Sequence, residues 1–469
     1  MGRPVGIGCG GKGLPIPFHR SPLRRLIALL DTGSTGFMLV CTMLVLLMTP
    51  GLAFFYGGLS RRKNVVNTMV MIFAVLGIVG VAWVACGWSF AYGGDGSIPV
   101  FGGLDQLGCL SAVNDMVAEA AGTPDAFAIL SGQGALGTDP ELAASYPAII
   151  DIVFQMAFAM ITCAIITGAV AGRMKFGAVC AFVAVWVLAV YAPLAHMVWG
   201  GEGSLIGEVI GALDFAGGDV VHISSGLTGL VLCIMLGRRK GFAVLSYRPH
   251  NVPFVALGAA LLWFGWFGFN AGSEFAADGV AALALLNTVT ASAAGVLSWL
   301  VAERVHVGKC TLVGAATGLV AGLVAITPAA GFVEPWAALV MGAVTSPVVY
   351  AAIAWAKRRI GYDDALDAFG CHCVGGIVGG VLTGLFCVPE LSWTDAGGLL
   401  YTGDWSLLGA QVLGIVVTVV FVVAADVVLG FIVRACFGGS LRVSAADEAA
   451  GLDVAVHGES AYPAYLGLD

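Results

Sequence analysis

The chain has 469 residues, of which 59% are hydrophobic and only 11% are charged. A soluble domain carries about a quarter charged residues, so this composition excludes an ordinary soluble protein and indicates a membrane protein built from helices of about 20 apolar residues. The net charge of −8 is less informative than the placement of the charges. We expect neither enzymatic activity nor a nucleic-acid partner.

The first 33 residues differ from the rest of the chain because they are rich in glycine and carry five basic residues. Their one apolar run is shorter than the core of a signal peptide, which needs about 7–15 residues. We interpret residues 1–33 as an N-terminal extension and assign them no fold. Beyond it, apolar runs predict eleven transmembrane helices, at residues 34–56, 64–92, 147–171, 176–197, 220–237, 251–270, 278–302, 310–326, 336–356, 372–388 and 405–433.

Basic residues predict the orientation of these helices. Outside the extension, all sixteen Lys and Arg residues lie in alternate loops or in the C-terminal tail, and the polar insert 93–146 holds seven acidic residues but no basic one. Positive residues stay on the cytoplasmic side. We therefore expect the N-terminus outside and the C-terminus in the cytoplasm, in the inner (plasma) membrane.

Eleven spans divide into two sets of five and one extra helix. An odd number of spans per set places the second set in the opposite orientation, as in an inverted repeat. The predicted fold is all-α. Its parts are a first repeat at 34–237, a cytoplasmic loop at 238–250, a second repeat at 251–388, an outer loop with the eleventh helix at 389–434, and a cytoplasmic tail at 435–469.

Two histidines occupy equivalent places in the two repeats. His222 follows Asp214 in the fifth span, and His372 follows Asp367 in the tenth. Ionisable groups at membrane depth are costly and indicate function. Two neutral imidazoles can bond to one another and offer hydrogen bonds to a small polar solute. The alternatives are two separate histidines bonded to backbone carbonyls, or a pair of haem ligands. Cys371 and Cys373 flank His372 but point elsewhere on a helix, so we expect neither a metal nor a cofactor.

Several aromatic and acidic residues near the helix ends have two interpretations each. Trp199 and Phe269 lie at outer ends of spans, and Phe154 and Phe158 share one helix face. An indole face can attract a cation, but interfacial anchoring and ordinary packing explain such residues equally well. We expect Asp214 and Asp219 to act as helix caps. We expect Asp426, in the eleventh helix, to form an interhelical hydrogen bond.

Five stretches together resemble the Amt/Mep/Rh ammonium transporter family, on its Amt side. The matching stretches are residues 50–59, 214–222, 265–273, 367–380 and the tail 451–463. The motif at 214–222 and the tail are the most specific of them. The resemblance covers about residues 34–463.

This resemblance implies a homotrimer with a pore through each protomer, carrying ammonium or ammonia. It also implies a tail that docks a PII-class nitrogen regulatory protein. The residues that match the family's functional positions are Trp199 and Ser273 in an outer vestibule, Phe158 and Phe269 as a gate, His222 and His372 as twin lumen histidines, Phe154 and Thr327 along the pore, and Asp214 as the structural aspartate of the vestibule.

Three departures from the family pattern stand out. Gly172 occupies the place of a usual glutamate, which puts loop coupling on the inner face in doubt. Glu202, in a slightly longer loop, and Glu274, directly after Ser273, add carboxylates near the outer mouth. We expect these two carboxylates, with the acidic insert, to concentrate cations there.

The predicted function is ammonium transport. Ammonium would be selected at the mouth and deprotonated, and ammonia would pass the phenylalanines and histidines. Potassium has no proton to lose and would be excluded. Two alternatives remain open, namely an ammonium sensor that signals through its tail and a neutral gas channel of the Rh type.

Overall fold

Membrane-length helices make up most of the structure. The computed structural model describes residues 31–109, 146, 149–242, 248–394 and 396–462. Within these ranges eleven helical segments are long and apolar enough to span a membrane, which confirms the predicted number and the all-α class. They are Thr32–Leu59, Arg62–Tyr92, Ile149–Val170, Phe176–Trp199, Gly218–Leu236, Val252–Gly272, Gly279–Val307, Leu312–Ala329, Pro335–Gly361, Phe369–Phe386 and Ser406–Cys436. Most of the acidic insert, and all but the last three residues of the expected extension, lie outside the described residues.

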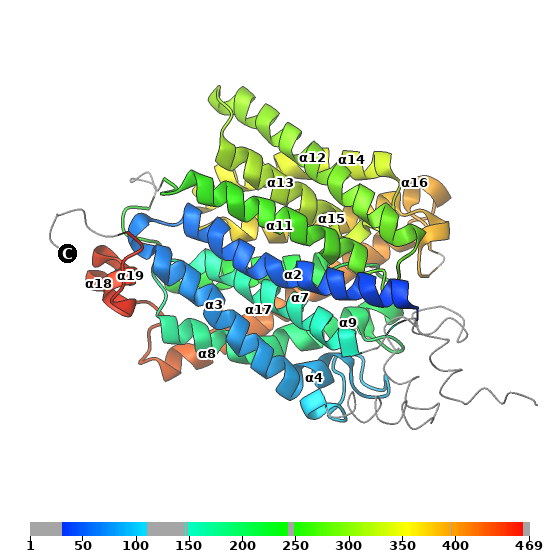
Figure 1. The fold of residues 1–469 in the computed structure, drawn as a ribbon, viewed down its shortest axis with the longest axis horizontal. Helices are drawn as coiled ribbons and strands as arrows, with labels where there is room; N and C mark the ends of the chain where they lie inside the picture. Colours follow the sequence, from blue (N-terminus) through cyan, green and yellow to red (C-terminus); the bar gives the residue numbers. More distant parts are fainter. Residues whose placement is uncertain (1–30, 110–145, 147–148, 243–247, 395, 463–469) are drawn as a thin grey trace, which may run out of the picture.

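The α-helical parts of these spans carry the labels of Figure 1. They are α2 (Thr32–Leu59), α3 (Val65–Ala82), α4 (Trp88–Tyr92), α7 (Ile149–Val170), α8 (Phe176–Trp186), α9 (Ala192–Trp199), α10 (Ser224–Leu236), α11 (Val252–Gly272), α12 (Gly279–Val307), α13 (Leu312–Ile326), α14 (Pro335–Ala351), α15 (Val374–Phe386) and α17 (Ser406–Cys436), with α16 (Leu399–Thr402) in the loop before α17.

Both histidine-bearing spans begin with a wider helical turn. The π-helix η7 (Gly218–Ile223) precedes α10, and the π-helix η10 (Phe369–Cys373) precedes α15. Such turns are rare and occur frequently at functional sites. Both histidines therefore project from irregular starts of helices rather than from regular α-helix.

The two repeats meet through equivalent helices. Figure 1 shows α2 and α11, the first helix of each repeat, side by side along most of their length. Glycines make this approach possible. A Cβ added at Gly258 of α11 would lie 2.2 Å from the backbone nitrogen of Phe55, and one at Gly268 would lie 2.7 Å from the Leu44 side chain.

At the centre, the starts of α10 and α15 pack together, and α17 packs against both helices.

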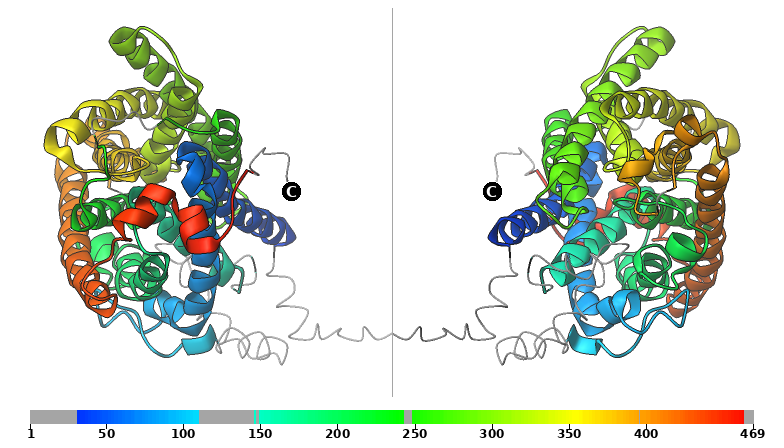
Figure 2. Two further views of the ribbon diagram at one scale, coloured as in Figure 1. Left: turned by 90° about the vertical axis from the view of Figure 1, so that its left-hand side faces the viewer. Right: turned by 90° about the vertical axis from the view of Figure 1, so that its right-hand side faces the viewer.

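The C-terminal tail lies across one end of the bundle. Figure 2 shows its helices α18 (Ala445–Ala450) and α19 (Leu452–His457) on this end. The Arg442 guanidinium donates to the carbonyls of Leu236 and Arg238 at the end of α10. The Leu452 N–H donates to the Asn64 side chain at 2.9 Å, before the start of α3. The tail is thus joined to the helix that carries His222.

Candidate functional site

The two histidines meet at the centre of the bundle. Their Nδ1 atoms are 3.2 Å apart and both side chains are buried. One imidazole must donate and the other accept. The structure thus contains a bonded pair rather than two separate histidines held by backbone carbonyls. His222 Nε2 has no hydrogen-bond partner among the described residues, so the pair keeps a free ring nitrogen.

Aromatic rings continue outward from this pair in an unbroken row. His222 stacks at 6.0 Å on Phe269, which stacks at 4.1 Å and 17° on Phe158. The Phe158 ring in turn contacts Trp199 edge-to-face at 6.2 Å. The resemblance implied a gate of Phe158 and Phe269 and a vestibule with Trp199. In the structure these three rings and His222 come together from four helices.

A narrow cavity lies beside the histidines. Its volume of about 10 Å³ is close to the smallest that holds one water molecule. Apart from the two imidazoles, its walls are apolar or aromatic. They are formed by Met48, Leu52, Phe55, Ile161, Ile165, Val221, Leu262, Trp266, Phe269 and Val320, together with His222 and His372.

A wider cavity of about 350 Å³ opens beside Trp199. Trp393 and Asp214 also line it, and so do the carboxylates Glu202 and Glu208. The indole N–H of Trp199 donates to the Asp214 carbonyl at 2.8 Å, which fixes the ring between this cavity and Phe158. Sequence reasoning placed Glu202 near the outer mouth but did not identify Glu208 or Trp393.

Asp214 holds the start of the His222 helix. Its carboxylate accepts from the backbone N–H groups of Gly217, Gly218 and Asp219 at 2.6–2.8 Å, and from Val220 at 3.4 Å. Burial raises the pKa of Asp214, and these N–H groups oppose that effect. Four amides without a helical partner are satisfied by this one side chain.

The predicted capping role of Asp219 is wrong. The N-cap position belongs to Gly217, whose φ of 114° only glycine adopts readily. The Asp219 carboxylate instead accepts from the Thr418 hydroxyl at 3.2 Å, linking the start of this helix to α17. Asp426 makes the expected interhelical bond, accepting from the Trp186 indole at 2.9 Å.

Ser273 lies one turn beyond Phe269, directly after the last residue of α11. Its hydroxyl donates to the Phe269 carbonyl at 2.9 Å, so the oxygen keeps its lone pairs for a donor. Burial, followed by the nearby Asp278 carboxylate, raises the pKa of Glu274 to about 8. The carboxylate that the sequence placed here is therefore mostly protonated at neutral pH.

Phe154 and Thr327 do not line the narrow cavity. The Phe154 ring packs against the rings of Phe158 at 4.9 Å and Phe275 at 5.7 Å. Thr327 accepts from the indole of Trp266 at 3.0 Å, behind that ring. Trp266 itself stacks on His222 at 5.3 Å and lines the cavity. Sequence reasoning gave it no role, although it lies in the motif that contains Phe269.

At the end of the bundle that carries the C-terminal tail, Gly172 adopts a φ of +75° and faces Asn64. A Cβ at this position would lie 2.4 Å from the Asn64 amide nitrogen. The next residue, Arg173, is buried and donates to the Asp363 carbonyl, while Arg239 forms an ion pair of 2.5 Å with the Asp363 carboxylate.

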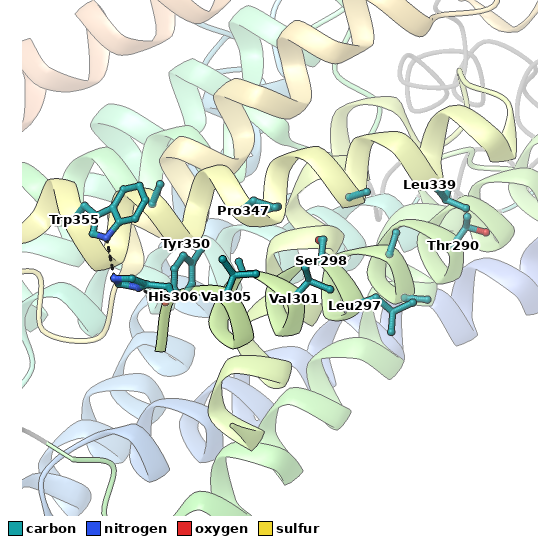
Figure 3. A pocket seen from close by; sticks show the side chains of 15 residues that line it. Thr290, Leu297, Ser298, Val301, Val305, His306, Leu339, Pro347, Tyr350 and Trp355 are labelled. Carbon is teal, nitrogen blue, oxygen red and sulfur yellow. Dashed lines mark hydrogen bonds between the residues drawn. The ribbon is translucent and has the colours of Figure 1, made fainter. Parts of the chain in front are cut away.

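A further groove lies on the outside of the bundle, between α12 and α14. It has a volume of about 1080 Å³ and is lined mainly by apolar side chains such as Leu297, Val301 and Val305. Figure 3 shows these side chains facing α14, with Trp355 donating to His306 at one end. Neither of the two paired histidines lines it.

Comparison with known proteins gives consistent matches. Residues 36–462 match the model of the Ammonium Transporter Family. An ammonium transporter of Aquifex aeolicus is 46% identical over 436 residues, which cover 93% of this chain and 94% of the relative.

Solved structures agree with this match. The crystal structure of Saccharomyces cerevisiae Mep2 aligns with a TM-score of 0.77 and 31% identity, covering 89% of this chain and 92% of Mep2. A structure described as a sensor Amt protein aligns with a TM-score of 0.78 and 26% identity, covering 92% of this chain and 99% of that one.

Proposed function

Because the chain belongs to the ammonium transporter family, we propose that it takes ammonium at an outer aromatic mouth, removes its proton, and conducts ammonia past His222 and His372. The row of rings from Trp199 to His372 is the observation that carries this proposal. It joins an open, acidic cavity to a narrow apolar one along a single path.

Residues at the mouth select the cation. The Trp199 face supplies cation–π attraction of about 0.5–2 kcal/mol. The Ser273 oxygen accepts one N–H of ammonium. Glu202 and Glu208 add negative charge beside Trp199 and raise the local cation concentration. Asp214 acts through the helix start that it caps.

The narrow cavity conducts the neutral solute and excludes ions. Burying an unpaired charge costs far more than a few hydrogen bonds return. Ammonia is neutral, fits the cavity and can bond to the free Nε2 of His222. Potassium cannot become neutral, so the same walls exclude it.

Replacing Trp199 tests the mouth. The cation–π energy predicts that Trp199→Leu raises the ammonium concentration for half-maximal transport by about 2- to 30-fold. Trp263→Leu is the matched control, because the Trp263 indole donates to Ser292 between α11 and α12. Ammonia influx into proteoliposomes, followed with an internal pH dye, gives this concentration. An equal effect of both substitutions would contradict the assignment.

We also propose a homotrimer. The groove between α12 and α14 is concave and apolar, and α2 and α11 carry exposed apolar side chains such as Leu39, Met43 and Phe264. Two different faces of this kind suit a ring of three copies. Light scattering of the purified protein, corrected for detergent, should give three times the mass of one chain. A monomeric mass would contradict this assembly.

The tail suits a PII-class nitrogen regulatory protein. Val454 and Val456 of α19 are 66% and 40% exposed at the end of the bundle to which the tail is joined. Basic side chains gather at this end, where Lys63, Lys175 and Lys240 donate to tail carbonyls. This placement supports a tail on the cytoplasmic side of a protein embedded in the inner membrane. Val454→Asp should abolish binding of a purified PII-class protein without changing ammonia influx, and undiminished binding would contradict the proposed surface.

A sensing role is the second candidate, favoured by the similarity to a sensor Amt protein. A sensor would bind ammonium at the mouth and pass no solute. Ammonia influx into proteoliposomes separates the two functions.

A further inference from the structure

Helix α17 lies outside the two repeats, yet it carries polar side chains on the face that it turns toward them. Gln411, Thr418 and Asp426 are seven and eight residues apart, a spacing that brings them to one side of an α-helix. All three are buried. Thr418 and Asp426 bond to side chains of neighbouring spans. Gln411, near the start of α17, bonds to the backbone instead.

The Gln411 amide bonds to both backbone polar groups of one residue. Its Oε1 accepts from the Leu213 N–H at 2.5 Å, and its Nε2 donates to the Leu213 carbonyl at 2.9 Å. The same nitrogen also donates to the Gly380 carbonyl at 3.2 Å. Gly380 lies in α15, about two turns beyond His372. One side chain therefore joins the segment before the His222 span to the His372 span.

Close packing leaves this amide little freedom to turn away. A Cβ added at Gly384 of α15 would lie 3.2 Å from the Gln411 Cγ. A Cβ added at Gly414 of α17 would lie 3.0 Å from the Ala212 side chain. Gln411 itself is only 3% exposed. The oxygen and the two N–H groups of the amide therefore keep fixed partners, and a side chain that lacks either an acceptor or a donor cannot replace it.

Leu213 directly precedes the residue that orients Trp199. The Leu213 carbonyl and the Asp214 nitrogen belong to one planar peptide group. Holding the Leu213 carbonyl thus sets the direction in which the chain enters Asp214, whose own carbonyl accepts from the Trp199 indole at 2.8 Å. Leu213, Asp214 and Trp199 all line the wider cavity, whereas Gln411 does not. Gln411 therefore lies behind the wall of the mouth.

We propose that Gln411 is a positioning residue for ammonium capture, because it holds the Leu213–Asp214 peptide and thereby the place and tilt of the Trp199 ring. This inference rests on the proposed capture of ammonium at Trp199. Gln411 does not touch the cation, so its loss weakens capture and leaves conduction past the histidines unchanged. A residue that only stabilised the fold would lower the amount of active protein without changing the ammonium concentration for half-maximal influx.

Gln411→Leu removes the amide and keeps an apolar stem. We expect this change to raise the ammonium concentration for half-maximal influx by about 2- to 30-fold, the range set by the cation–π attraction of Trp199. The maximal rate per folded protein should change less than this concentration does. Asp426→Leu is the matched control, because it makes the same replacement on the same face of α17, about four turns farther along. That variant should keep the concentration of the unmodified protein.

A double-mutant cycle shows whether Gln411 acts through Trp199. In the Trp199→Leu background, Gln411→Leu should change the concentration for half-maximal influx by less than about 2-fold, because the ring that it positions is absent. Effects of the two substitutions that multiply would overturn the proposal. A single Gln411→Leu variant with a lower maximal rate at an unchanged concentration would overturn it as well.

Gln411→Glu provides a second readout in case Gln411→Leu does not fold. A protonated carboxyl accepts from the Leu213 N–H and donates to the Leu213 carbonyl, whereas a carboxylate only accepts. Capture by this variant should therefore be near normal in acid and weaken as the pH rises. Comparison with the unmodified protein at each pH cancels the titration of Glu202, Glu208 and Asp219 near this wall. A ratio that is constant with pH, or loss of the folded state in both variants, would refute the assignment.

The rise in unfolding temperature on addition of ammonium measures capture without transport. At one fixed ammonium concentration the rise should be smaller in Gln411→Leu than in Asp426→Leu, and an equal rise would contradict the proposal. If the unmodified protein shows this rise but no influx, the transport function fails and the comparison still decides the role of Gln411. Absence of both would overturn the capture site and the role of Gln411 with it.

Discussion

Gly172 allows a test of how the tail is held. Gly172→Ala places a Cβ 2.4 Å from the Asn64 amide nitrogen, in a left-handed conformation that costs an L-residue about 1–2 kcal/mol. To avoid the contact, Asn64 must leave the Leu452 N–H, a buried donor worth a further 1–3 kcal/mol or so when unpaired. We expect a total destabilisation of about 2–5 kcal/mol, part of it confined to the tail.

Gly308→Ala is the matched control for this change. Gly308 has a φ of +81° at the end of α12, and an added Cβ meets nothing within 4 Å among the described residues. It should therefore cost only the backbone strain, about 1–2 kcal/mol. Hydrogen exchange at α19 should be about 5- to 150-fold faster in Gly172→Ala and unchanged in Gly308→Ala, since 1.36 kcal/mol is a tenfold change.

A double-mutant cycle identifies the contact responsible. Asn64→Ala removes the atoms that clash and leaves the Asn64 Cβ at 4.0 Å from the new methyl group. In that background Gly172→Ala should cost only the backbone strain, so the coupling energy is about 1–3 kcal/mol. A coupling near zero, or equally rapid exchange of α19 in both glycine variants, would refute the reasoning.

Three further predictions concern the mouth. Asp214→Asn keeps one oxygen for Gly217 and Gly218 but turns an N–H₂ group toward the two remaining amides, so it should lower the unfolding temperature and ammonia influx less than Asp214→Ala does; equal losses would contradict the assigned bonds. Glu274 should lose its stabilising contribution as the pH rises from its ordinary value of 4.5 through about 8, so thermal stability should fall less between pH 5 and 9 in Glu274→Gln, and identical curves would contradict its burial. At neutral pH and low salt, Glu202→Gln should weaken the apparent affinity for ammonium more than Glu274→Gln, and if both replacements together leave that affinity unchanged, carboxylates do not concentrate cations at the mouth.

The number of spans could be predicted because apolar runs and turn-rich loops alternate clearly along the chain. The side of each helix that faces the protein interior could not be predicted. Helices that are apolar on all sides have no amphipathic period, so the sequence does not indicate which face turns inward. Trp266 was missed for this reason, since nothing in its helix distinguishes it from Trp263.

Helix starts were the second source of error. Asp219 has the residue type and position of an N-cap, but the turn at Gly217 directs the N–H groups toward Asp214. Asp364 was overlooked because the sequence around Asp367 is more similar to the motif around Asp214. It is Asp364, however, that accepts from the backbone N–H of Phe369, at 2.7 Å. In both cases the hydrogen bonds, rather than the residue types, decide which carboxylate holds the helix.

The central claim is that ammonium loses a proton and passes the histidine pair as ammonia, while potassium stays outside. Its most direct test uses proteoliposomes that contain a pH dye. Ammonium is added suddenly to the outside solution, and the measurement is repeated with potassium at equal concentration. We predict internal alkalinisation faster than in empty liposomes with ammonium, slowed by Phe158→Trp, and no protein-dependent current with potassium. Potassium current equal to that with ammonium, or alkalinisation no faster than in empty liposomes, would contradict the account.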